Sequence, residues 1–313
     1  MQYSFPVPMA RLGKVHAILM RSGFMLVAVS ALLFACKGTL IKYLYAQGAS
    51  PDDVMLLRMV FSLPVYGWVA CRLLLRERRG LQVSHILGAS AVGVSGYYLA
   101  SYLDLLGLQF VSAGLERVIL YTYPVFVVLL SAGLLGRKVS LSMLVCIAVT
   151  YVGLLLVFYA DIHVRPAMSL VATTKGTVYV LLSAIAFSVY VIGSEYYMRI
   201  FSSALFTALA MLAAAWAVLL HYSVFNAFSH LLNLSKAVYA GCGITALFFT
   251  VLPSFMMSAG VRMIGSAKAG AIGMIGPVAT VLIAGTVLGE HVSVMQFVGL
   301  LVVMLGVQRL HKL

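Results

Sequence analysis

Charged residues are scarce in this chain of 313 residues. They make up 9% of it, whereas an ordinary soluble domain carries about 25%. Hydrophobic residues make up 63%. A water-soluble fold of this composition would lack the polar groups needed to cover its surface, so the composition excludes a soluble globular domain. The chain needs an apolar solvent, and the lipid bilayer is that solvent.

Sequence motifs of common enzymes and motors are also missing. The chain has no H-E-x-x-H zinc motif, no G-x-S-x-G nucleophile elbow and no P-loop. The four cysteines lie in apolar runs and form no C-x-x-C pair, so we interpret them as small buried hydrophobic residues. We therefore expect a protein that is not an enzyme and that holds no metal and no cofactor.

Ten apolar stretches are long enough to cross a bilayer, because a helix of about 20 residues spans its hydrocarbon core. They lie at approximately 22–45, 54–75, 84–106, 112–135, 140–160, 175–198, 202–222, 236–261, 265–288 and 292–310. Short connections between them favour antiparallel packing of neighbouring helices. The sequence therefore predicts an all-α integral membrane protein with ten transmembrane helices. We interpret the segment 223–235 as an external interfacial helix.

Lysine and arginine are distributed unevenly between the two sides of the predicted membrane. Of the 21 such residues, 14 fall on one side, four on the other and three inside the spans. By the positive-inside rule both termini are cytoplasmic, including the tail 1–21. Because the basic residues form short clusters between apolar runs, we expect no nucleic-acid partner. We expect a multi-pass protein of the bacterial inner membrane, with the lipid bilayer as a partner.

An internal repeat at an offset of 153 residues is the most informative pattern. Residues 124–140 read PVFVVLLSAGLLGRKVS, and residues 277–293 read PVATVLIAGTVLGEHVS, so that Pro124 matches Pro277. The unit holds five helices, an odd number, so its second copy crosses the membrane in the opposite sense. Inverted repeats of this kind are typical of secondary transporters. The predicted organisation is a first repeat at 22–160, an external linker at 161–174 and a second repeat at 175–310.

These motifs resemble those of the drug/metabolite transporter superfamily, EamA type. The matching features are Ile41-Lys42 at the end of the first span, Arg58 in the second span and the two matched runs that begin at Pro124 and Pro277. The resemblance extends over residues 22–310. It implies ten helices with both termini inside, no nucleotide-driven motor, and mostly export of amino acids, other metabolites or toxic compounds.

The chain departs from the family pattern after the glycine of the first matched run. The family often carries glutamate at this position in both halves, whereas this chain has Arg137 in the first half and Glu290 in the second. The resemblance does not name a substrate. By resemblance we expect proton-coupled export or facilitated exchange, with uptake as the alternative direction and with monomer and homodimer both open.

Five charged residues fall inside the predicted spans, all toward the outer side of the membrane. They are Lys37, Arg58, Asp104, Glu116 and Arg117. Charge at this depth costs a few kcal/mol or more, so each residue needs a partner or a role. One interpretation is an outer gate or substrate vestibule held by ion pairs. The alternative is that terminal side chains reach back to the interface.

Three of these charges suggest particular roles. Lys37 is predicted to bind a substrate carboxylate or to pair with Glu116. Asp104 and Glu116 are the candidates for proton coupling, because withdrawal from water favours the neutral form of a carboxylate. Substitution of Lys37 by alanine is expected to weaken recognition of an anionic substrate.

Helical spacing adds tyrosines and a serine to the predicted substrate pathway. Tyr97, Ser101 and Asp104 share one face of the third span. Arg117 and Tyr121 share one face of the fourth. With Lys37, the residues Tyr97, Ser101, Arg117 and Tyr121 are therefore the pathway candidates. Packing in the core is the alternative for the tyrosines.

Two further sets of candidates come from the repeat. Pro124 and Pro277 lie at matched positions within their spans, where each frees a carbonyl and is predicted to break or kink its helix. Glu195 and Lys268 are predicted to form an inner gate, although the positive-inside bias alone would explain the lysine.

The repeat and the embedded charges together favour a carrier of a small metabolite that works by alternating access. A channel or receptor, or an intramembrane enzyme, is the alternative from another class. An enzyme would need paired catalytic groups, and the seven histidines are scattered.

Overall fold

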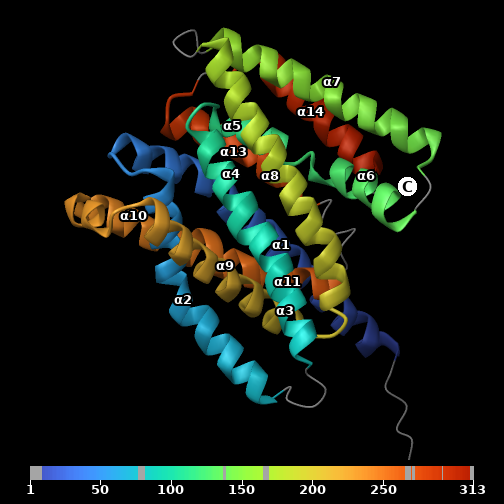
Figure 1. The fold of residues 1–313 in the computed structure, drawn as a ribbon. Helices are drawn as coiled ribbons and strands as arrows, with labels where there is room; N and C mark the ends of the chain where they lie inside the picture. Colours follow the sequence, from blue (N-terminus) through green and yellow to red (C-terminus); the bar gives the residue numbers. More distant parts are fainter. Residues whose placement is uncertain are drawn as a thin grey trace, which may run out of the picture.

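The fold is a bundle of helices (Figure 1). The computed structural model describes residues 9–76, 82–136, 139–164, 169–264, 269, 272–290 and 292–310, and this part of the chain holds no β-strand. The helices of the first half are α1 (Met9–Ala46), α2 (Pro51–Arg76), α3 (Val83–Gly93), η1 (Val94–Leu99), α4 (Ala100–Leu108), α5 (Ala113–Leu120), α6 (Tyr123–Leu135) and α7 (Leu141–Val164). Those of the second half are α8 (Leu170–Tyr197), α9 (Ser203–Phe225), η2 (Phe228–Asn233), α10 (Lys236–Ala246), η3 (Leu247–Val251), α11 (Leu252–Ile264), α13 (Ile275–Val287) and α14 (Val294–Leu310).

Ten helical segments match the ten predicted spans. Within the described residues, eight are long and apolar enough to cross a membrane, and the shorter apolar helices α13 and α14 complete the set. The prediction of an all-α membrane fold with ten spans is thus confirmed. Two helices begin clearly earlier than predicted. α1 begins at Met9 rather than near residue 22, and α8 begins at Leu170 rather than near residue 175, because Ser169 caps α8 by accepting a hydrogen bond from the Ala172 amide.

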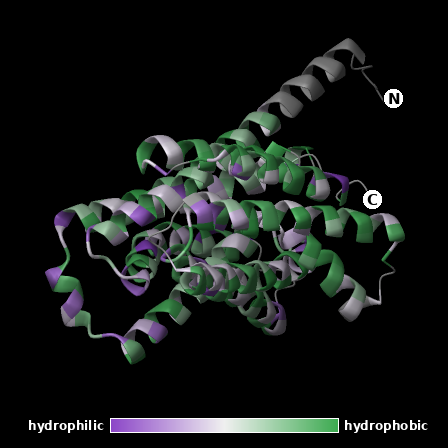
Figure 2. Ribbon diagram, turned by 90° about the horizontal axis from the view of Figure 1, so that it is seen from above, coloured by the Kyte–Doolittle hydropathy of each residue, from purple (hydrophilic) through white to green (hydrophobic). Residues whose placement is uncertain are grey.

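Large apolar side chains cover much of the outer surface. Trp216 is 70% exposed, and Leu155 on α7 is 65% exposed. Figure 2 shows hydrophobic residues along most of each helix and hydrophilic residues gathered mainly near helix ends and connections. A surface of this kind is stable against lipid and unfavourable against water. The bundle is therefore a multi-pass membrane domain.

The offset of 153 residues recurs in the backbone. Two of the spans contain a wider π-helical turn, and the turns begin at Val94 and Leu247, which are 247 − 94 = 153 residues apart. Gly136 and Gly289, which the repeat pairs, both have a φ of 65° and close the helices that carry Pro124 and Pro277. Only glycine adopts this left-handed conformation at little cost.

Helix packing repeats with the same offset. The neighbours α7 and α14 occupy equivalent places in the two halves and lie side by side in Figure 1. A β-carbon at Gly153 of α7 would lie 2.7 Å from the amide nitrogen of Val303. A β-carbon at Gly306 of α14 would lie 2.9 Å from the amide nitrogen of Thr150. Adding 153 to 150 and to 153 gives 303 and 306, so each contact is the image of the other.

A second pair of contacts obeys the same rule across the bundle. A β-carbon at Gly107 of α4 would lie 3.3 Å from the amide nitrogen of Val180 on α8. A β-carbon at Gly260 of α11 would lie 3.3 Å from the amide nitrogen of Val27 on α1. Each half therefore packs its first helix against the third span of the other half. The fold consists of two inverted five-helix repeats that interlock rather than lie side by side.

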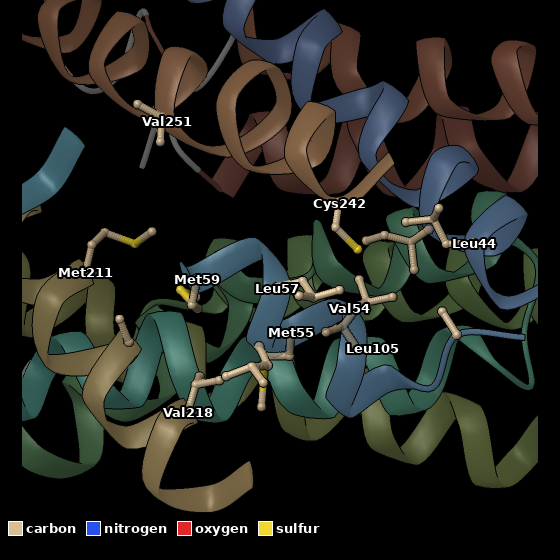
Figure 3. Packing of buried hydrophobic residues seen from close by; sticks show 14 of the residues in the cluster. Leu44, Val54, Met55, Leu57, Met59, Leu105, Met211, Val218, Cys242 and Val251 are labelled. Atoms are coloured by element: carbon tan, nitrogen blue, oxygen red, sulfur yellow. The ribbon is translucent and has the colours of Figure 1, made fainter. Parts of the chain in front are cut away.

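The apolar core is largest around α2, which packs against α9, α10 and α4. Figure 3 shows Val54 and Leu57 of α2 close to Cys242 of α10 and Leu44 of α1. Cys242 is fully buried in this cluster, as predicted, but Cys71 is exposed and Cys36 and Cys146 are only partly buried, so the prediction of four buried cysteines is wrong for Cys71. The core joins the two repeats, because α9 and α10 belong to the second half and α1 and α2 to the first.

The segment 223–235, predicted as an external interfacial helix, is divided between two elements. The helix α9 continues to Phe225, and only the short 3₁₀ helix η2 (Phe228–Asn233) follows. Asn226 leaves the helix with extended backbone angles, which ends the helical hydrogen-bond ladder. The apolar residues up to Phe225 therefore extend the span, whereas Phe228 and Leu232 lie in η2 with exposed side chains.

Candidate functional site

The fourth span is broken in the interior of the bundle. α5 ends at Leu120, a turn follows at Tyr121 and Thr122, and α6 begins at Tyr123. Pro124 is the second residue of α6, where its missing N–H does not matter. The Ile119 carbonyl accepts hydrogen bonds from the Thr122 amide at 2.9 Å and the Thr122 hydroxyl at 2.6 Å, so it stays satisfied where the helix is interrupted.

The ninth span shows the matching break. Met274 forms a turn, and α13 starts at Ile275 with Pro277 as its third residue. The two breaks meet, because the Tyr121 hydroxyl donates to the Gly273 carbonyl at 2.7 Å. Two interrupted helices from opposite repeats thus contact each other, the arrangement that borders substrate sites in many transporters.

α1 joins this crossing through its backbone carbonyls. Arg117 Nη2 donates to the Phe34 carbonyl at 3.2 Å. The Thr280 hydroxyl of α13 lies 3.3 Å from the Ala35 carbonyl. The break therefore brings side chains of α5 and α13 against the same turn of α1. Arg117 and Tyr121 lie together here, as the spacing predicted.

Next to this crossing lies a cluster of buried charges. Lys37 Nζ is 3.2 Å from Asp104 Oδ2, so α1 is tied to α4. Lys37 is therefore paired with Asp104 and not with Glu116, the partner that the sequence suggested. The sequence could not choose between them, because the choice depends on how α4 and α5 rotate against α1.

Glu116 is the least compensated acid of this cluster. It is 1% exposed, and neither carboxylate oxygen has a hydrogen-bond partner among the described residues. The nearest cation is its neighbour Arg117, whose Nε lies 3.8 Å from Oε2. The Asp104 carboxylate is close enough to share a hydrogen bond with it once one of the two carries a proton. Gly38 of α1 makes room for this carboxylate, since a β-carbon there would lie 3.4 Å from Oε2.

One ion pair that the sequence did not predict links the two repeats. Lys42 Nζ lies 2.8 Å from Glu290 Oε1, and the Ala113 amide lies 3.2 Å from Glu290 Oε2. Ala113 is the first residue of α5, so Glu290 from the second repeat caps a helix of the first. Lys42 and Glu290 both belong to the family-like motifs, which was the only sequence signal for this contact.

The remaining predicted residues are not gathered at one place. Tyr97 lies in the π-helical turn η1, and its hydroxyl is 3.0 Å from the Tyr190 hydroxyl on α8. Asp104 instead faces Lys37, so Tyr97 and Asp104, which were predicted to share one face of the third span, have different neighbours. Ser101 is half-buried between them on α4.

The inner-gate interpretation gains no support from the geometry. Glu195 pairs with Arg199 at 2.9 Å, one turn along the chain, and the two side chains are 64% and 75% exposed. Lys268, the other candidate, lies outside the described residues. A surface pair of this kind contributes little to stability.

The fold and this interior define a polytopic membrane protein with inverted repeats and broken helices at its centre. The model of the EamA-like transporter family matches residues 21–159 and 174–308. The chain belongs to the EamA-like transporter family, as the motifs suggested, and is a membrane transporter.

Relatives agree with this assignment. The chain is 28% identical over 283 residues to the protein called uncharacterized transporter YcbK of Bacillus subtilis (strain 168), with 89% of each chain covered. It is 24% identical to uncharacterized transporter sll1319 of Synechocystis sp. (strain ATCC 27184 / PCC 6803 / Kazusa), covering 92% of this chain and 93% of the other. A crystal structure with 16% identity superimposes with a TM-score of 0.61 and covers 92% of this chain and 96% of that one, which supports the fold.

Proposed function

We propose that the protein is a secondary transporter that moves a small metabolite across the bacterial inner membrane by alternating access, in the direction of export. The contact between the two broken helices, Tyr121 to Gly273, carries this proposal. It joins one element from each inverted repeat at the level of buried charges, where a rocking motion would expose the same residues alternately to the two sides. An intramembrane enzyme is the alternative, and the sequence gives it no support because it carries no H-E-x-x-H, G-x-S-x-G or P-loop motif.

The proposed substrate pathway runs past the charge cluster to the helix crossing. Arg117 and Tyr121 belong to the break, and Lys37 lies beside it on α1. The proposed coupling ion is the proton, held by the Asp104 and Glu116 carboxyl groups. Their oxygens Asp104 Oδ1 and both Glu116 oxygens are buried without hydrogen-bond partners in the described structure. Two neighbouring carboxylates withdrawn from water favour the binding of one proton between them.

Untargeted metabolite profiling of cells and medium tests the transport function. We would compare cells that overproduce the wild type, cells with Arg117→Gln at equal membrane abundance, and cells with an empty vector. A compound enriched in the medium only with the wild type supports export. A compound depleted from the medium only with the wild type reverses the direction. No difference between the three strains contradicts the proposed function.

The proposed orientation places both termini in the cytoplasm and the connection 226–235 outside. Alkaline phosphatase is active only after export, so its insertion into 226–235 is expected to give active enzyme. Its fusion after Leu313 is expected to give inactive enzyme, and a green fluorescent protein at the same end is expected to fluoresce. The reverse pattern would overturn the orientation.

A further inference from the structure

Arg58 differs from the other charges of this cluster because no counter-ion among the described residues is in contact with its guanidinium. The side chain is 2% exposed, and within the described residues its Nε and Nη2 atoms are buried without a hydrogen-bond partner. Arginine remains charged in proteins, so it does not escape this situation by losing a proton. A buried charge that lacks partners is costly. Two strong hydrogen-bond donors of Arg58 therefore remain available to a ligand at this point.

The charge count of the cluster leads to the same residue. Lys37 is matched by Asp104 at 3.2 Å, and Arg117 lies 3.8 Å from Glu116. Arg58 is the third cation of this cluster and lies near Lys37 and Asp104, so the five charges sum to 3 − 2 = +1 when both acids are ionised. Protonation of the carboxyl pair would raise this excess further. A bound anion would remove it.

The surroundings of Arg58 suit an organic anion better than a bare ion. Tyr45 and Tyr66 lie near the guanidinium. The Tyr66 hydroxyl contacts the Ser254 hydroxyl at 2.9 Å, and the Tyr66 ring lies 5.5 Å from the ring of Phe255. Arg58 is thus placed where the first repeat meets α11 of the second, beside both hydroxyl groups and aromatic surface. The planar fork of a guanidinium fits a carboxylate with two parallel hydrogen bonds.

We propose that Arg58 binds the carboxylate of the substrate, so that the transported compound is a small carboxylic acid or amino acid. This inference rests on the proposed transport function. It moves the predicted anion-binding role from Lys37, which is occupied by Asp104, to Arg58. The bound carboxylate neutralises the excess charge of the cluster, and the hydroxyl and aromatic groups around Tyr66 contact the rest of the molecule.

Thermal unfolding of the purified full-length protein in detergent tests the proposal. The probes are the twenty proteinogenic amino acids and a set of aliphatic and aromatic monocarboxylates, each compared with its own primary amide. At least one acid is expected to raise the unfolding temperature of the wild type, and its amide is expected not to. Arg58→Met should weaken the binding of that acid at least about tenfold, because hydrogen bonds to charged groups are the strong ones. Arg58→Lys keeps the positive charge but lacks the planar fork, so its affinity for the acid should lie between those of the wild type and Arg58→Met.

Three outcomes would overturn the inference. They are equal stabilisation by acid and amide, unchanged binding of the acid to Arg58→Met, and no stabilisation of the wild type by any acid. A matching elution profile and unfolding temperature of ligand-free Arg58→Lys exclude misfolding as the cause of weaker binding. Metabolite profiling separates the two proposals. Export of a neutral or cationic compound contradicts the Arg58 inference and leaves the transport function intact, whereas absence of any transported compound contradicts the function itself.

Discussion

Replacement of Gly153 by valine is expected to lower the stability of the folded protein by about 3 kcal/mol, as expected for overpacking of a close helix contact. The new side chain would meet the backbone of α14, where even a β-carbon would lie 2.7 Å from Val303 N and 2.8 Å from Gly299 O. Backbone atoms of a helix do not move aside as a flexible side chain would. The helices α7 and α14 must therefore separate along their contact.

The internal repeat predicts a matching effect at the equivalent glycine of the second half. Gly306→Val places the same group against the equivalent backbone of α7, so its effect should be of similar size. Gly67→Val is the matched control, because Gly67 lies in α2 and a β-carbon there meets no atom within 4 Å. The measurement is the unfolding temperature of the protein in detergent, followed by size-exclusion chromatography. If both valine variants unfold at the same temperature as Gly67→Val, the close approach of α7 and α14 is contradicted.

Glu116→Gln is expected to abolish transport driven by a pH gradient and to spare exchange of substrate for substrate. The amide imitates the protonated carboxyl group and cannot release a proton, so the carrier cycles without using the gradient. The site is suited to this chemistry because the side chain is 1% exposed and neither carboxylate oxygen has a hydrogen-bond partner among the described residues. The measurement compares gradient-driven flux and counterflow in proteoliposomes, with the substrate that metabolite profiling identifies.

Glu116→Asp serves as the control for this prediction, since it retains a carboxyl group in the same surroundings and should retain part of the gradient-driven flux. An unchanged unfolding temperature would show that the glutamine variant is folded. Gradient-driven flux at the wild-type level in Glu116→Gln would remove this residue from the coupling mechanism. Loss of both flux and exchange would assign Glu116 to substrate passage instead of coupling.

The repeat explains why so much of the fold was predictable. Matched prolines and glycines, such as Pro124 with Pro277, mark backbone positions where other residues would not fit, so they preserve the offset when apolar residues drift. Hydropathy gave the ten spans because a bilayer requires long apolar helices. At residues 223–235 the prediction missed a boundary, because the apolar residues up to Phe225 continue the preceding span before η2 begins at Phe228.

The candidate site was harder to predict than the fold. The sequence identified Lys37 and Glu116 as embedded charges, but the partner of Lys37 depends on helix rotation, which shifts at the π-helical turn η1. The contact between Lys42 and Glu290 joins residues 248 apart, and no local pattern indicates such a distance. The sequence also could not predict that Arg58 lacks a counter-ion in contact among the described residues. This depends on which side chains pack around the guanidinium in the folded interior.

The capping of α5 by Glu290 makes the two ends of the carrier energetically different. Glu290 binds Lys42 and the Ala113 amide, whereas the repeat places Arg137 at the matched position of the first half. A cation cannot accept a hydrogen bond from a helix amide, so the sequence offers this type of cap in the second repeat and not at the matched position of the first. If the two repeats rock as proposed, the contact of Glu290 with Lys42 and Ala113 would stabilise the conformation in which it forms. It would then bias the resting population of conformations before any substrate binds.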